Sequence, residues 1–578
     1  MKTIFQELNE LVISSVKNTF DVSLDASKDY VLEASKEIFG DYQVNISFQL
    51  SKQLHKNPLE IAETLAGSIK SPLFDKVEVV KPGFINLFIS RDYFMQKIKE
   101  LSEDKNLGIV QSGSNQTVVV DYSSPNIAKE MHVGHLRSTI IGDAIVRVYQ
   151  QLGYNVIRQN HIGDWGTQFG MLIEHLIDLG WKDSSEHSIS DLNALYKESK
   201  VKFDTDPDFA ERSHLRVVKL QGGDKESVDL WTALTNESKK HFNKMYERLG
   251  VLLNENDYKG ESFYNDKLNA FADRMLAEKK ASVSNGAVCV FPQGFTGRDN
   301  EPVPLILRKS DGGFGYDATD MVALEYRVKT LGAQKIIYIT DSRQKLHFAM
   351  LFQAAKDTGI DGGSTSLEHV SFGSVLGQDG KPFKTRSGET VTLSSLLDEA
   401  EQHSKEIILA KNPDTDAQNL DRLSQAIGIS AIKYADLSCD RIKDYVFNWE
   451  RMLAFDGNTA PYIQNAYVRC RALIAKGQQQ GKKCALHAIT NDDEKRIVKK
   501  CLALNGVVQS VAKANEPHRL CGYLYELASS YHSFYESCPV LSEKNEEILE
   551  TRLAISKLVS EILARGMELL GITVIEHM

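Results

Sequence analysis

The chain has 578 residues, a formal net charge of −10, 42% hydrophobic residues and 25% charged residues. This length exceeds what one hydrophobic core usually supports, so we expect three or four domains. The acidic balance excludes a generally basic nucleic-acid coat, although it leaves room for a local basic face. The apolar content excludes global disorder, and no apolar run approaches the roughly 20 residues of a membrane span.

Residues 1–15 combine apolar and acidic positions and lack a small-residue cleavage site, which predicts an amphipathic helix rather than a signal peptide. The seven cysteines form no CxxC pair, so neither a zinc ribbon nor a disulfide framework is indicated. Scattered reduced thiols are typical of the cytosol, and we expect a cytoplasmic protein with no membrane partner.

Four regions follow one another along the chain. Residues 1–110 mix short helices with a strand-like stretch at 77–90 that turns at a Pro-Gly pair, which predicts a small α+β module. Residues 117–122 form a short apolar strand suited to a parallel sheet. A helical pattern over 136–152 and a strand over 154–160 complete a βαβ unit.

The same alternation returns as a strand at 335–340, a helix at about 344–357 and a strand near 369–375. Between the two parts lies charged, mixed sequence, so the pattern predicts a split parallel sheet with an insertion at about 168–305. From about 395 onward the pattern is almost entirely helical. We therefore divide the chain at 1–110, 111–390, 391–454 and 455–578, the third part being a helical linker.

Residues 465–515 differ in charge from the rest of this acidic chain. They hold ten basic and three acidic residues, an excess of seven positive charges. Two interpretations stay open: a solvated helix face, or a surface that binds a polyanion.

The candidate catalytic motif, SSPNIAKEMHVGH at 123–135, follows the first strand of the sheet and leads into a helix. A helix N-terminus can hold phosphate, and His132 and His135 are three residues apart, so they face the same side of its first turn. Gly134 has no Cβ and lets a flat base approach. The motif suits chemistry at a nucleotide α-phosphate, with pyrophosphate leaving. Histidine pairs at this spacing are also common as structural residues, and the placement favours the functional interpretation.

The sequence lacks the motifs of two other classes of nucleotide-binding and metal-binding enzymes. The chain has no GxxxxGK[ST], which argues against a γ-phosphate NTPase, and no HExxH, which argues against a zinc protease. A second element carries positive charge: the glycine-rich loop at 377–388 contains Lys381, Lys384 and Arg386. This loop is either the pyrophosphate side of the site or an exposed basic turn.

Residues 123–144 together with NHIGDWGTQFG (160–170) resemble arginyl-tRNA synthetases, a family of class I aminoacyl-tRNA synthetases. The resemblance extends over the N-terminal module, residues 456–469 and the end at Met578. It implies a multidomain α/β fold: a split Rossmann-type catalytic domain, a small α+β N-terminal domain that contacts the tRNA elbow, and an all-helical C-terminal domain that binds the anticodon.

The resemblance also implies a reaction and its partners. ATP and L-arginine would give arginyl-adenylate and pyrophosphate, and arginine would pass to the 3′-terminal adenosine of tRNA(Arg), with activation itself dependent on bound tRNA. We expect Mg²⁺ with ATP, no structural metal, and a monomer.

Carried over residue by residue, His132, Gly134 and His135 match the signature that binds ATP. The loop at 382–386 takes the place of the second class signature, but the second lysine of that signature falls on Thr385. We expect Lys129 to supply the missing charge, with Lys384 and Arg386 as helpers.

A guanidinium needs planar carboxylate acceptors. Tyr316 and Asp320 stand four residues apart, so they share one helical face, and the resemblance implies that they bind the arginine side chain. It implies further substrate contacts by Asp121, Asn126 and Gln344. His347 and Asp341 lie beside Gln344 in the sequence and could shape the same wall.

Residues that contact tRNA are expected in both terminal domains. Aromatic side chains can stack on unpaired bases, although aromatics at helical spacing are also common core residues. By resemblance the candidates are Tyr462, Tyr525, Met578, Phe84 and Asn86. Asn465 stands where the family often has a second aromatic residue.

Two other functions share part of this sequence pattern. A small-molecule nucleotidyltransferase shares the HxGH motif, but such enzymes are typically single domains, and the long helical C-terminal region counts against it. An inactive RNA-binding relative would be expected to lack HxGH or the amino-acid pocket, and His132, His135, Tyr316 and Asp320 are all present.

Overall fold

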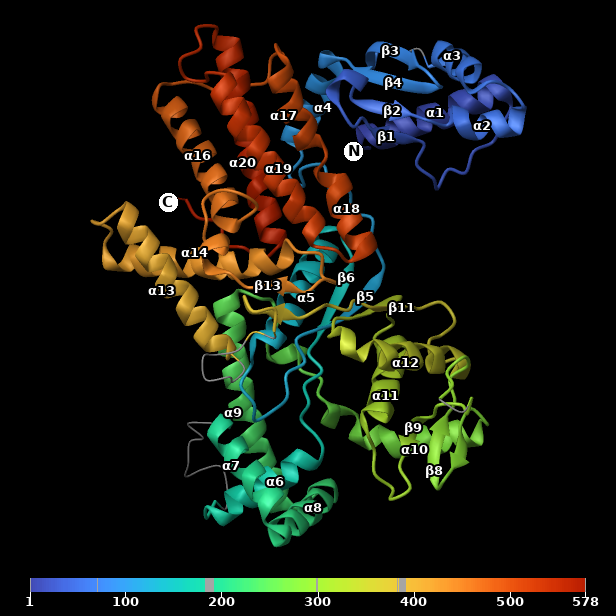
Figure 1. The fold of residues 1–578 in the computed structure, drawn as a ribbon, viewed down its shortest axis with the longest axis vertical. Coiled ribbons are helices and arrows are strands. Elements are labelled where there is room, and N and C mark those ends of the chain that lie inside the picture. The colour runs from blue at the N-terminus through green and yellow to red at the C-terminus, as the bar shows by residue number, and fades with distance from the viewer. Residues whose placement is uncertain are drawn as a thin grey trace.

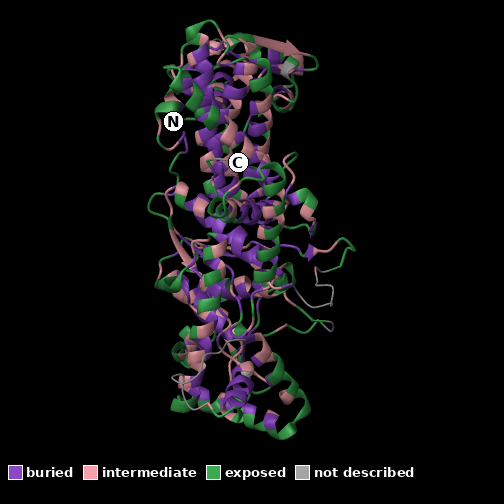
Figure 2. Cartoon of the chain, turned by 90° about the vertical axis from the view of Figure 1, so that its left-hand side faces the viewer, coloured by how far each residue is buried: buried purple, intermediate pink, exposed green. Residues whose placement is uncertain are grey.

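The computed structural model describes residues 2–69, 71–181, 192–297, 300–381, 383 and 391–576. Figure 1 shows an elongated molecule in which the N-terminal sheet lies to one side of a long helical bundle, and two lobes extend from the opposite end. Figure 2 shows buried positions running through the interior along the whole length of the molecule, with exposed positions at its margins. Within the described residues, no helix is both long enough and apolar enough to cross a membrane.

The N-terminal module is a four-stranded antiparallel sheet with helices packed on it. Its first helix is amphipathic, as predicted, and is preceded by the N-cap residue Thr3, whose side chain and that of Gln6 form a capping box. The predicted stretch 77–90 is confirmed as the β3–β4 hairpin. In the order β1-β2-β4-β3, the strands are Val31–Glu33, Tyr42–Val44, Phe84–Ile89 and Phe74–Val80; the helices are α1 (Ile4–Phe20), η1 (Glu37–Phe39), α2 (Ser47–Leu54), α3 (Pro58–Ser68) and α4 (Arg91–Glu103).

The catalytic region contains a four-stranded parallel sheet in the order β11-β10-β5-β6. Alternate residues of strand β5 (Thr117–Asp121) point to opposite faces of the sheet. Val118 and Val120 belong to the hydrophobic core shared with the helical bundle, and Val119 belongs to the core that includes α10 (Asn265–Ala277) and α11 (Tyr316–Lys329). The predicted βαβ unit is confirmed. Its elements and those that complete the sheet are β5 (Thr117–Asp121), α5 (Val133–Gln151), β6 (Asn155–Gln159), β10 (Lys335–Tyr338), η4 (Ser342–Gln344), α12 (Lys345–Thr358) and β11 (Ser366–His369).

The strand expected at 369–375 was placed wrongly. The sheet strand β11 ends at His369, although the backbone still pairs with the segment after β10 as far as Phe372, through a parallel bridge to Asp341. The Gly373 amide donates to the Arg441 carbonyl (2.9 Å). Beyond it, β12 (Val375–Leu376) pairs in parallel with β13 (Tyr445–Val446) in a separate small sheet.

The insertion forms the two lobes at the lower end of Figure 1. One lobe is purely helical; its helices are α6 (Thr167–Asp178), α7 (Leu192–Thr205), α8 (Pro207–Gln221) and α9 (Lys225–Leu249). The other lobe packs helices on a three-stranded antiparallel sheet and includes α12 from the second half of the parallel sheet. Its further elements are η2 (Glu255–Asp257), η3 (Glu261–Tyr264), α10 (Asn265–Ala277), β7 (Ser282–Ser284), β8 (Ala287–Val290), β9 (Leu305–Arg308) and α11 (Tyr316–Lys329).

The remainder is helical apart from β13, as the sequence predicts. Its helices are α13 (Leu393–Lys411), α14 (Ala417–Leu437), α15 (Trp449–Met452), α16 (Ala460–Gln479), α17 (Asp492–Leu502), α18 (Leu504–Ala514), α19 (His518–Ser537) and α20 (Glu546–Leu569). The segment after α20 folds back onto the middle of α5. There Lys433 is buried and donates to the carbonyls of Leu249 and Gly571. Gly571 has φ +64°, and a Cβ there would lie 2.8 Å from Lys433 Nζ, so this turn requires glycine.

Part of the basic stretch at 465–515 faces the N-terminal module rather than solvent. Lys495 pairs with Asp41 (2.8 Å), and Lys499 pairs with Glu33 (3.0 Å). These two lysines therefore join two parts of the chain, a role that neither interpretation of the charge pattern included.

Candidate functional site

The HxGH segment forms the first turn of α5, where each imidazole satisfies a backbone amide. His132 is the N-cap residue: its Nδ1 accepts from the Gly134 amide (3.0 Å), and His135 Nδ1 accepts from the His132 amide (3.1 Å). The two ring centroids are 3.9 Å apart. Because each Nδ1 is an acceptor, a neutral ring carries its proton on Nε2, which stays available as a donor.

The surroundings keep both rings neutral. Burial lowers the pKa of His135 to about 3, and the neighbouring His132 and Lys129 act in the same direction. Burial also lowers the pKa of His132, helped by Lys129 and Arg343. Lys129 itself lies with its ammonium 4.4 Å from the centre of the Tyr196 ring of α7. The predicted cation therefore stands beside the predicted histidines.

The basic loop lies partly outside the described residues, and Lys384, Thr385 and Arg386 belong to that part. The described part begins with a turn in which the Gly377 amide donates to the Lys381 carbonyl (2.8 Å). Where the chain resumes, the Val133 amide donates to the Val391 carbonyl (3.1 Å), and the Leu393 amide donates to Met131 (2.7 Å). The segment that follows the loop is therefore hydrogen-bonded to HxGH.

The candidate arginine cluster lies at the start of α11. Tyr316 and Asp320 share one face, as predicted, and His347 of α12 connects them. His347 Nε2 is 2.7 Å from Asp320 Oδ2, and its ring meets the Tyr316 ring edge-on at 5.1 Å. The Tyr316 side chain is 64% exposed, so its ring can still receive a ligand. The interpretation that His347 shapes this wall agrees with this geometry.

Two members of this cluster were missed by the sequence analysis. His161, in the loop after β6, has its Nε2 3.8 Å from Asp320 Oδ1. Glu261, at the start of η3, is half-buried, and burial together with Asp320 and Asp164 raises its pKa to about 8. His161 belongs to the NHIGDW stretch, which was a usable signal, whereas Glu261 lies in the irregular insertion without a recognisable pattern.

Asp121 ends β5 but is not an open acceptor. Its Oδ2 accepts from Arg327 (2.6 Å), and its Oδ1 accepts from Ser124 Oγ (3.3 Å). Arg327 is almost fully buried and also donates to Gln159 (2.6 Å). The structure thus gives Asp121 a strong internal partner, and its contact with arginine stays a prediction.

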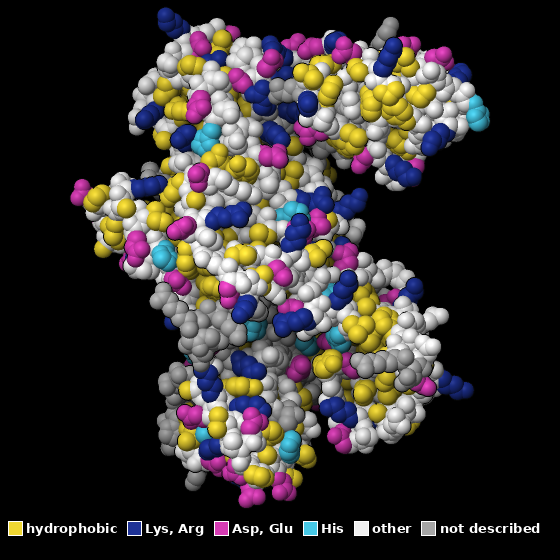
Figure 3. Space-filling view, in the orientation of Figure 1, with side chains coloured by type: hydrophobic (Ala, Val, Ile, Leu, Met, Phe, Trp, Pro, Cys, Tyr) yellow, Lys and Arg dark blue, Asp and Glu magenta, His cyan; other side chains and the backbone are white. Residues whose placement is uncertain are grey.

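Asn126 and Gln344 are both exposed. Asn126 lies against Gly163, where an added Cβ would be 2.1 Å from Asn126 Oδ1, so this close approach requires glycine. Gln344 precedes α12 and lies one turn before His347. Figure 3 shows histidine side chains at the upper end of the hollow between the two lobes. The two residues remain predicted substrate contacts.

The predicted anticodon residues Tyr462 and Tyr525 lie together although they are far apart in the sequence. Their ring centroids are 5.6 Å apart, and the His532 ring lies 5.1 Å from that of Tyr462. Arg469 donates to His532 Nδ1 (2.8 Å). All four side chains come from the neighbouring helices α16 and α19, whereas Met578 lies outside the described residues.

The two predicted contacts in the N-terminal module differ in accessibility. Phe84 is half-buried and meets Phe48 edge-on at 4.9 Å. Asn86 is 1% exposed and accepts from Gln43 Nε2 (2.8 Å). A direct contact of Asn86 with tRNA would require the sheet to open, so it stays a prediction.

Comparison with known proteins covers nearly the whole chain. The family model of the class I (R) tRNA synthetase catalytic domain matches residues 97–449, that of the arginyl-tRNA synthetase N-terminal domain matches 6–89, and that of the DALR anticodon-binding domain matches 463–578. The arginine–tRNA ligase of Psychromonas ingrahamii is 41% identical over 100% of both chains. The chain belongs to the arginyl-tRNA synthetase family.

Further relatives agree with this assignment. The arginine–tRNA ligase of Thermobifida fusca is 44% identical over 93% of this chain and 94% of its own. The Plasmodium falciparum arginyl-tRNA synthetase structure superposes with a TM-score of 0.84 at 33% identity, covering 100% of both chains. The Thermus thermophilus arginyl-tRNA synthetase has a TM-score of 0.82 at 22% identity over 100% of both chains, which shows the shared fold.

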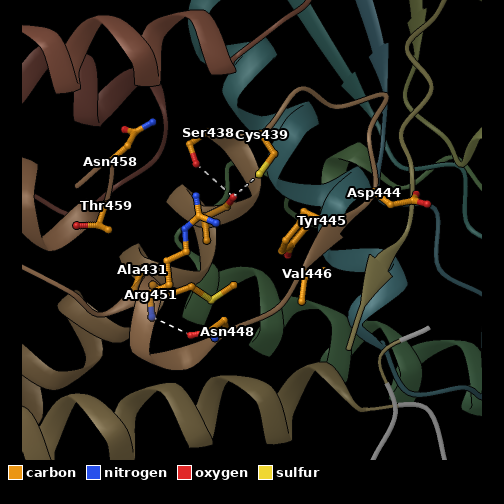
Figure 4. Close-up of a pocket in the computed structure, with 12 residues that line it drawn as sticks. Ala431, Ser438, Cys439, Asp444, Tyr445, Val446, Asn448, Arg451, Asn458 and Thr459 are labelled. Atoms are coloured by element: carbon orange, nitrogen blue, oxygen red, sulfur yellow. Dashed lines mark hydrogen bonds between the residues drawn. The ribbon is translucent and has the colours of Figure 1, made fainter. Parts of the chain in front are cut away.

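In this family member, a cavity of about 370 Å³ lies where β13, α14, α15 and the start of α16 meet. Arg451 reaches from α15 into this space towards Ser438 and Cys439 at the end of α14 (Figure 4). Asn458 and Thr459 lie on one side of it, and Tyr445 and Val446 lie on the other. Since β13 pairs with β12, the strand that leads into the basic loop, the cavity lies between the start of that loop and α16, the helix that carries Tyr462.

Proposed function

We propose that His132, His135 and Lys129 bind the phosphates of ATP, and that Tyr316 and Asp320 bind the guanidinium of arginine. The chain is an ATP-dependent arginine–tRNA ligase by family, which forms arginyl-adenylate and then charges its tRNA. The observation that carries the assignment of the amino-acid pocket is the Asp320 carboxylate, held 2.7 Å from His347 beside the accessible Tyr316 ring.

The two neutral imidazoles suit the phosphate step. As the arginine carboxylate attacks the α-phosphate, negative charge grows on the phosphoryl oxygens and on the leaving pyrophosphate. Fixed Nε2–H donors stabilise this charge without reorganising. Their Nδ1 atoms are held by the first turn of α5, so the donors are positioned before ATP arrives.

Positive charge on the pyrophosphate side would come from Lys129, with Lys384 and Arg386 as helpers and Gly134 leaving space for the adenine ring. Mg²⁺ would arrive bound to the ATP phosphates. Among the described residues, no group of His, Cys, Asp or Glu side chains is arranged to hold a metal ion, and we propose no structural metal.

The arginine pocket is acidic on several sides. Asp320 can accept two parallel hydrogen bonds from a guanidinium, a geometry that a lysine ammonium cannot match. Glu261 would ionise when a cation enters, because the neighbouring charge of Asp320 is then offset. We propose Asp121, Asn126 and Gln344 as further substrate contacts, Asp121 acting through its pair with Arg327.

Transfer of arginine requires tRNA(Arg), which we propose binds at both ends of the molecule. The domain division at 1–110, 111–390, 391–454 and 455–578 is close to the ranges of the three family models and is proposed on that basis. Tyr462 and Tyr525 would stack on unpaired anticodon bases, assisted by Met578, and Phe84 and Asn86 would face the tRNA elbow. We infer a cytoplasmic monomer.

The test is a charging assay with the purified chain, ATP, arginine and total tRNA, followed by Asp320→Asn. Removing one partner of a buried charge pair costs about 2–5 kcal/mol, so arginine affinity should fall by roughly 30-fold or more. ATP and tRNA binding should stay the same. Canavanine should compete with arginine, and lysine should not. Asp311→Asn, in the exposed turn before α11, serves as the control. Equal arginine affinities of the wild type and Asp320→Asn would show that the pocket lies elsewhere.

A further inference from the structure

His347 lies between two carboxylates of α11. Its Nε2 is 2.7 Å from Asp320 Oδ2, and its Nδ1 is 3.5 Å from Asp317 Oδ1. The side chain is 19% exposed, so both contacts are largely shielded from solvent. The Tyr316 ring closes one side of the imidazole at 5.1 Å. His347 therefore holds the carboxylate oxygen that a guanidinium would need.

The charged groups around this imidazole are mainly acidic. Asp317 and Asp320 face it from α11, and Glu261 reaches the same cluster from η3 through its repulsion with Asp320. On the other side of Asp320 stands His161, 3.8 Å away. Further groups with an electrostatic effect on members of this cluster are Asp164, which acts on Glu261, and Tyr338, whose hydroxyl is affected by Asp320. His369 of β11 is affected by His347 and also by Arg441 and Lys345.

This environment keeps His347 protonated in the free protein. Burial lowers its pKa, but the hydrogen bonds and charges of Asp317 and Asp320 outweigh burial and raise it to about 9. His369 responds in the opposite sense: burial lowers its pKa to about 4, and His347 is one of the cations that contribute. The imidazolium is thus the internal cation of the pocket.

We propose that His347 occupies the place of the arginine guanidinium on Asp320, and that it gives up one proton when arginine binds. The inference rests on the proposed function, in which Asp320 binds the guanidinium. The guanidinium enters as a cation and pairs with Asp320, the imidazolium N–H proton passes to solvent, and the bound imidazole is neutral. The site therefore carries the same charge before and after binding.

The physical reason is that two cations cannot share one shielded carboxylate without strong repulsion. Once Asp320 pairs with arginine, burial and the new positive charge both favour neutral His347. Since binding releases a proton, arginine affinity should increase as pH rises towards 9 and should level off above that value. His347 is a positioning residue in this scheme: it keeps the empty acidic pocket folded and sets which cation can enter.

Calorimetry on the full chain can count the proton. Arginine is titrated at pH 8.5 in two buffers of different ionisation enthalpy. With a His347 pKa of about 9, the wild type should release about 0.7 proton per arginine bound. His347→Gln should release only the roughly 0.2 proton that Glu261, with its pKa of about 8, still carries at pH 8.5, and its arginine affinity should change little with pH between 8.5 and 9.

Glu261→Gln is the matched control, because Glu261 is the other group in the cluster that could release a proton. Its pKa of about 8 leaves it mostly ionised at pH 8.5, so this variant should keep most of the release at that pH. Loss of the release in Glu261→Gln with retention in His347→Gln would overturn the proposal.

A second measurement follows the imidazole directly. The His347 ring signal in NMR should titrate near pH 9 in the free protein and below pH 7.5 with saturating arginine, with no change on adding lysine. If Asp320→Asn does not weaken arginine binding, the proposed function fails. If Asp320→Asn weakens arginine binding but His347 stays protonated in the complex, the proposed function stands. The inference that His347 occupies the guanidinium's place and releases a proton is then wrong.

Discussion

The two histidines of HxGH carry out two tasks with the two nitrogens of each ring. Nδ1 accepts a backbone amide in the first turn of α5, and Nε2 keeps a proton to donate. Replacing either histidine by alanine therefore removes a backbone hydrogen bond at the helix start and a phosphate donor at the same time. Because asparagine is a good N-cap but its amide does not reach as far as Nε2, it can separate the two tasks at position 132.

We expect His132→Asn to slow adenylate formation by roughly 100-fold or more, since removing one such donor costs about 2.7–4 kcal/mol in other enzymes. Its stability should stay close to that of the wild type, whereas His132→Ala should lose about 1 kcal/mol in addition. Pyrophosphate exchange with tRNA present and thermal unfolding measure the two effects. A wild-type exchange rate in His132→Asn would leave His132 with a capping role alone.

Lys129 is expected to supply the charge missing at position 385. Lys129→Ala should reduce the activation rate more than Thr385→Ala does, and adding Thr385→Lys should restore part of it. The reason is the position of Lys129, close enough to His132 and His135 to lower the pKa of both. Lys240→Ala on the exposed face of α9 is the control. A fully active Lys129→Ala enzyme would rule out this compensation.

The sequence predicted the residues whose role depends on nearby positions, such as the histidine pair at the helix start and Tyr316 with Asp320 on one helical face. It did not predict the pairing of Asp121, because the partner Arg327 is 206 residues away. The basic loop was predicted as a feature, but Lys384 and Arg386 lie outside the described residues, so their roles stay predictions.

At the scale of elements, α5 is attached to the helical part of the chain near its start as well as at its middle. Arg137 of α5 pairs with Asp436 of α14 (3.0 Å), and both side chains are at most 1% exposed. The guanidinium also lies 5.3 Å from the centre of the Tyr445 ring of β13. The helix that carries HxGH is thereby fixed to the elements that line the cavity of Figure 4.

Asp436→Ala should destabilise the protein by about 3–5 kcal/mol, because it leaves the buried Arg137 unpaired. The double variant Arg137→Met with Asp436→Leu should recover much of this loss, since a well-packed apolar pair can replace a buried ion pair. Chemical unfolding of both variants measures the difference. Equal stability of the single and double variants would contradict the pairing.

Tyr462→Ala should weaken tRNA binding while leaving arginine and ATP binding unchanged. A base stacked on an aromatic side chain contributes about 1–3 kcal/mol, which corresponds to roughly 5- to 150-fold in affinity. Tyr462→Phe keeps the ring and should bind tRNA nearly as the wild type does. Filter binding with tRNA(Arg) measures the affinity of each variant. An unchanged affinity in Tyr462→Ala would show that Tyr462 packs in the protein and does not contact tRNA.

At the scale of the whole molecule, ion pairs hold the N-terminal module against the bundle. Besides Lys495–Asp41 and Lys499–Glu33, Arg91 of α4 pairs with Asp492 at the start of α17 (2.6 Å). The local excess of positive charge at 465–515 was visible in the sequence. The ion pairs of this stretch with the N-terminal module could not be predicted from the sequence, because Asp41 and Lys495 are 454 residues apart.

Asp41→Lys should loosen the module, and adding Lys495→Asp should restore its attachment by reversing the pair. For two residues in contact we expect a coupling energy of about 0.5–3 kcal/mol in a double-mutant cycle. Thermal unfolding gives this energy, and small-angle scattering should show a larger radius for Asp41→Lys alone. Additive effects of the two changes would mean that the module is held by other contacts.

The fold-back of the segment after α20 has a consequence for how this protein is made. Arg147 of α5 donates to the carbonyls of Gly250 (2.8 Å) and Glu568 (3.5 Å), and Arg565 donates to Gln151 (2.9 Å). These partners in α20 are translated more than 400 residues after α5. Domains usually fold in the order in which they are synthesised, but α5, the helix that begins with HxGH, makes some of its contacts with a helix that is synthesised much later. We therefore expect a ribosome-bound chain that contains every candidate ATP and arginine contact but lacks α20 to miss these contacts of α5, and we expect full charging activity only after α20 has been synthesised.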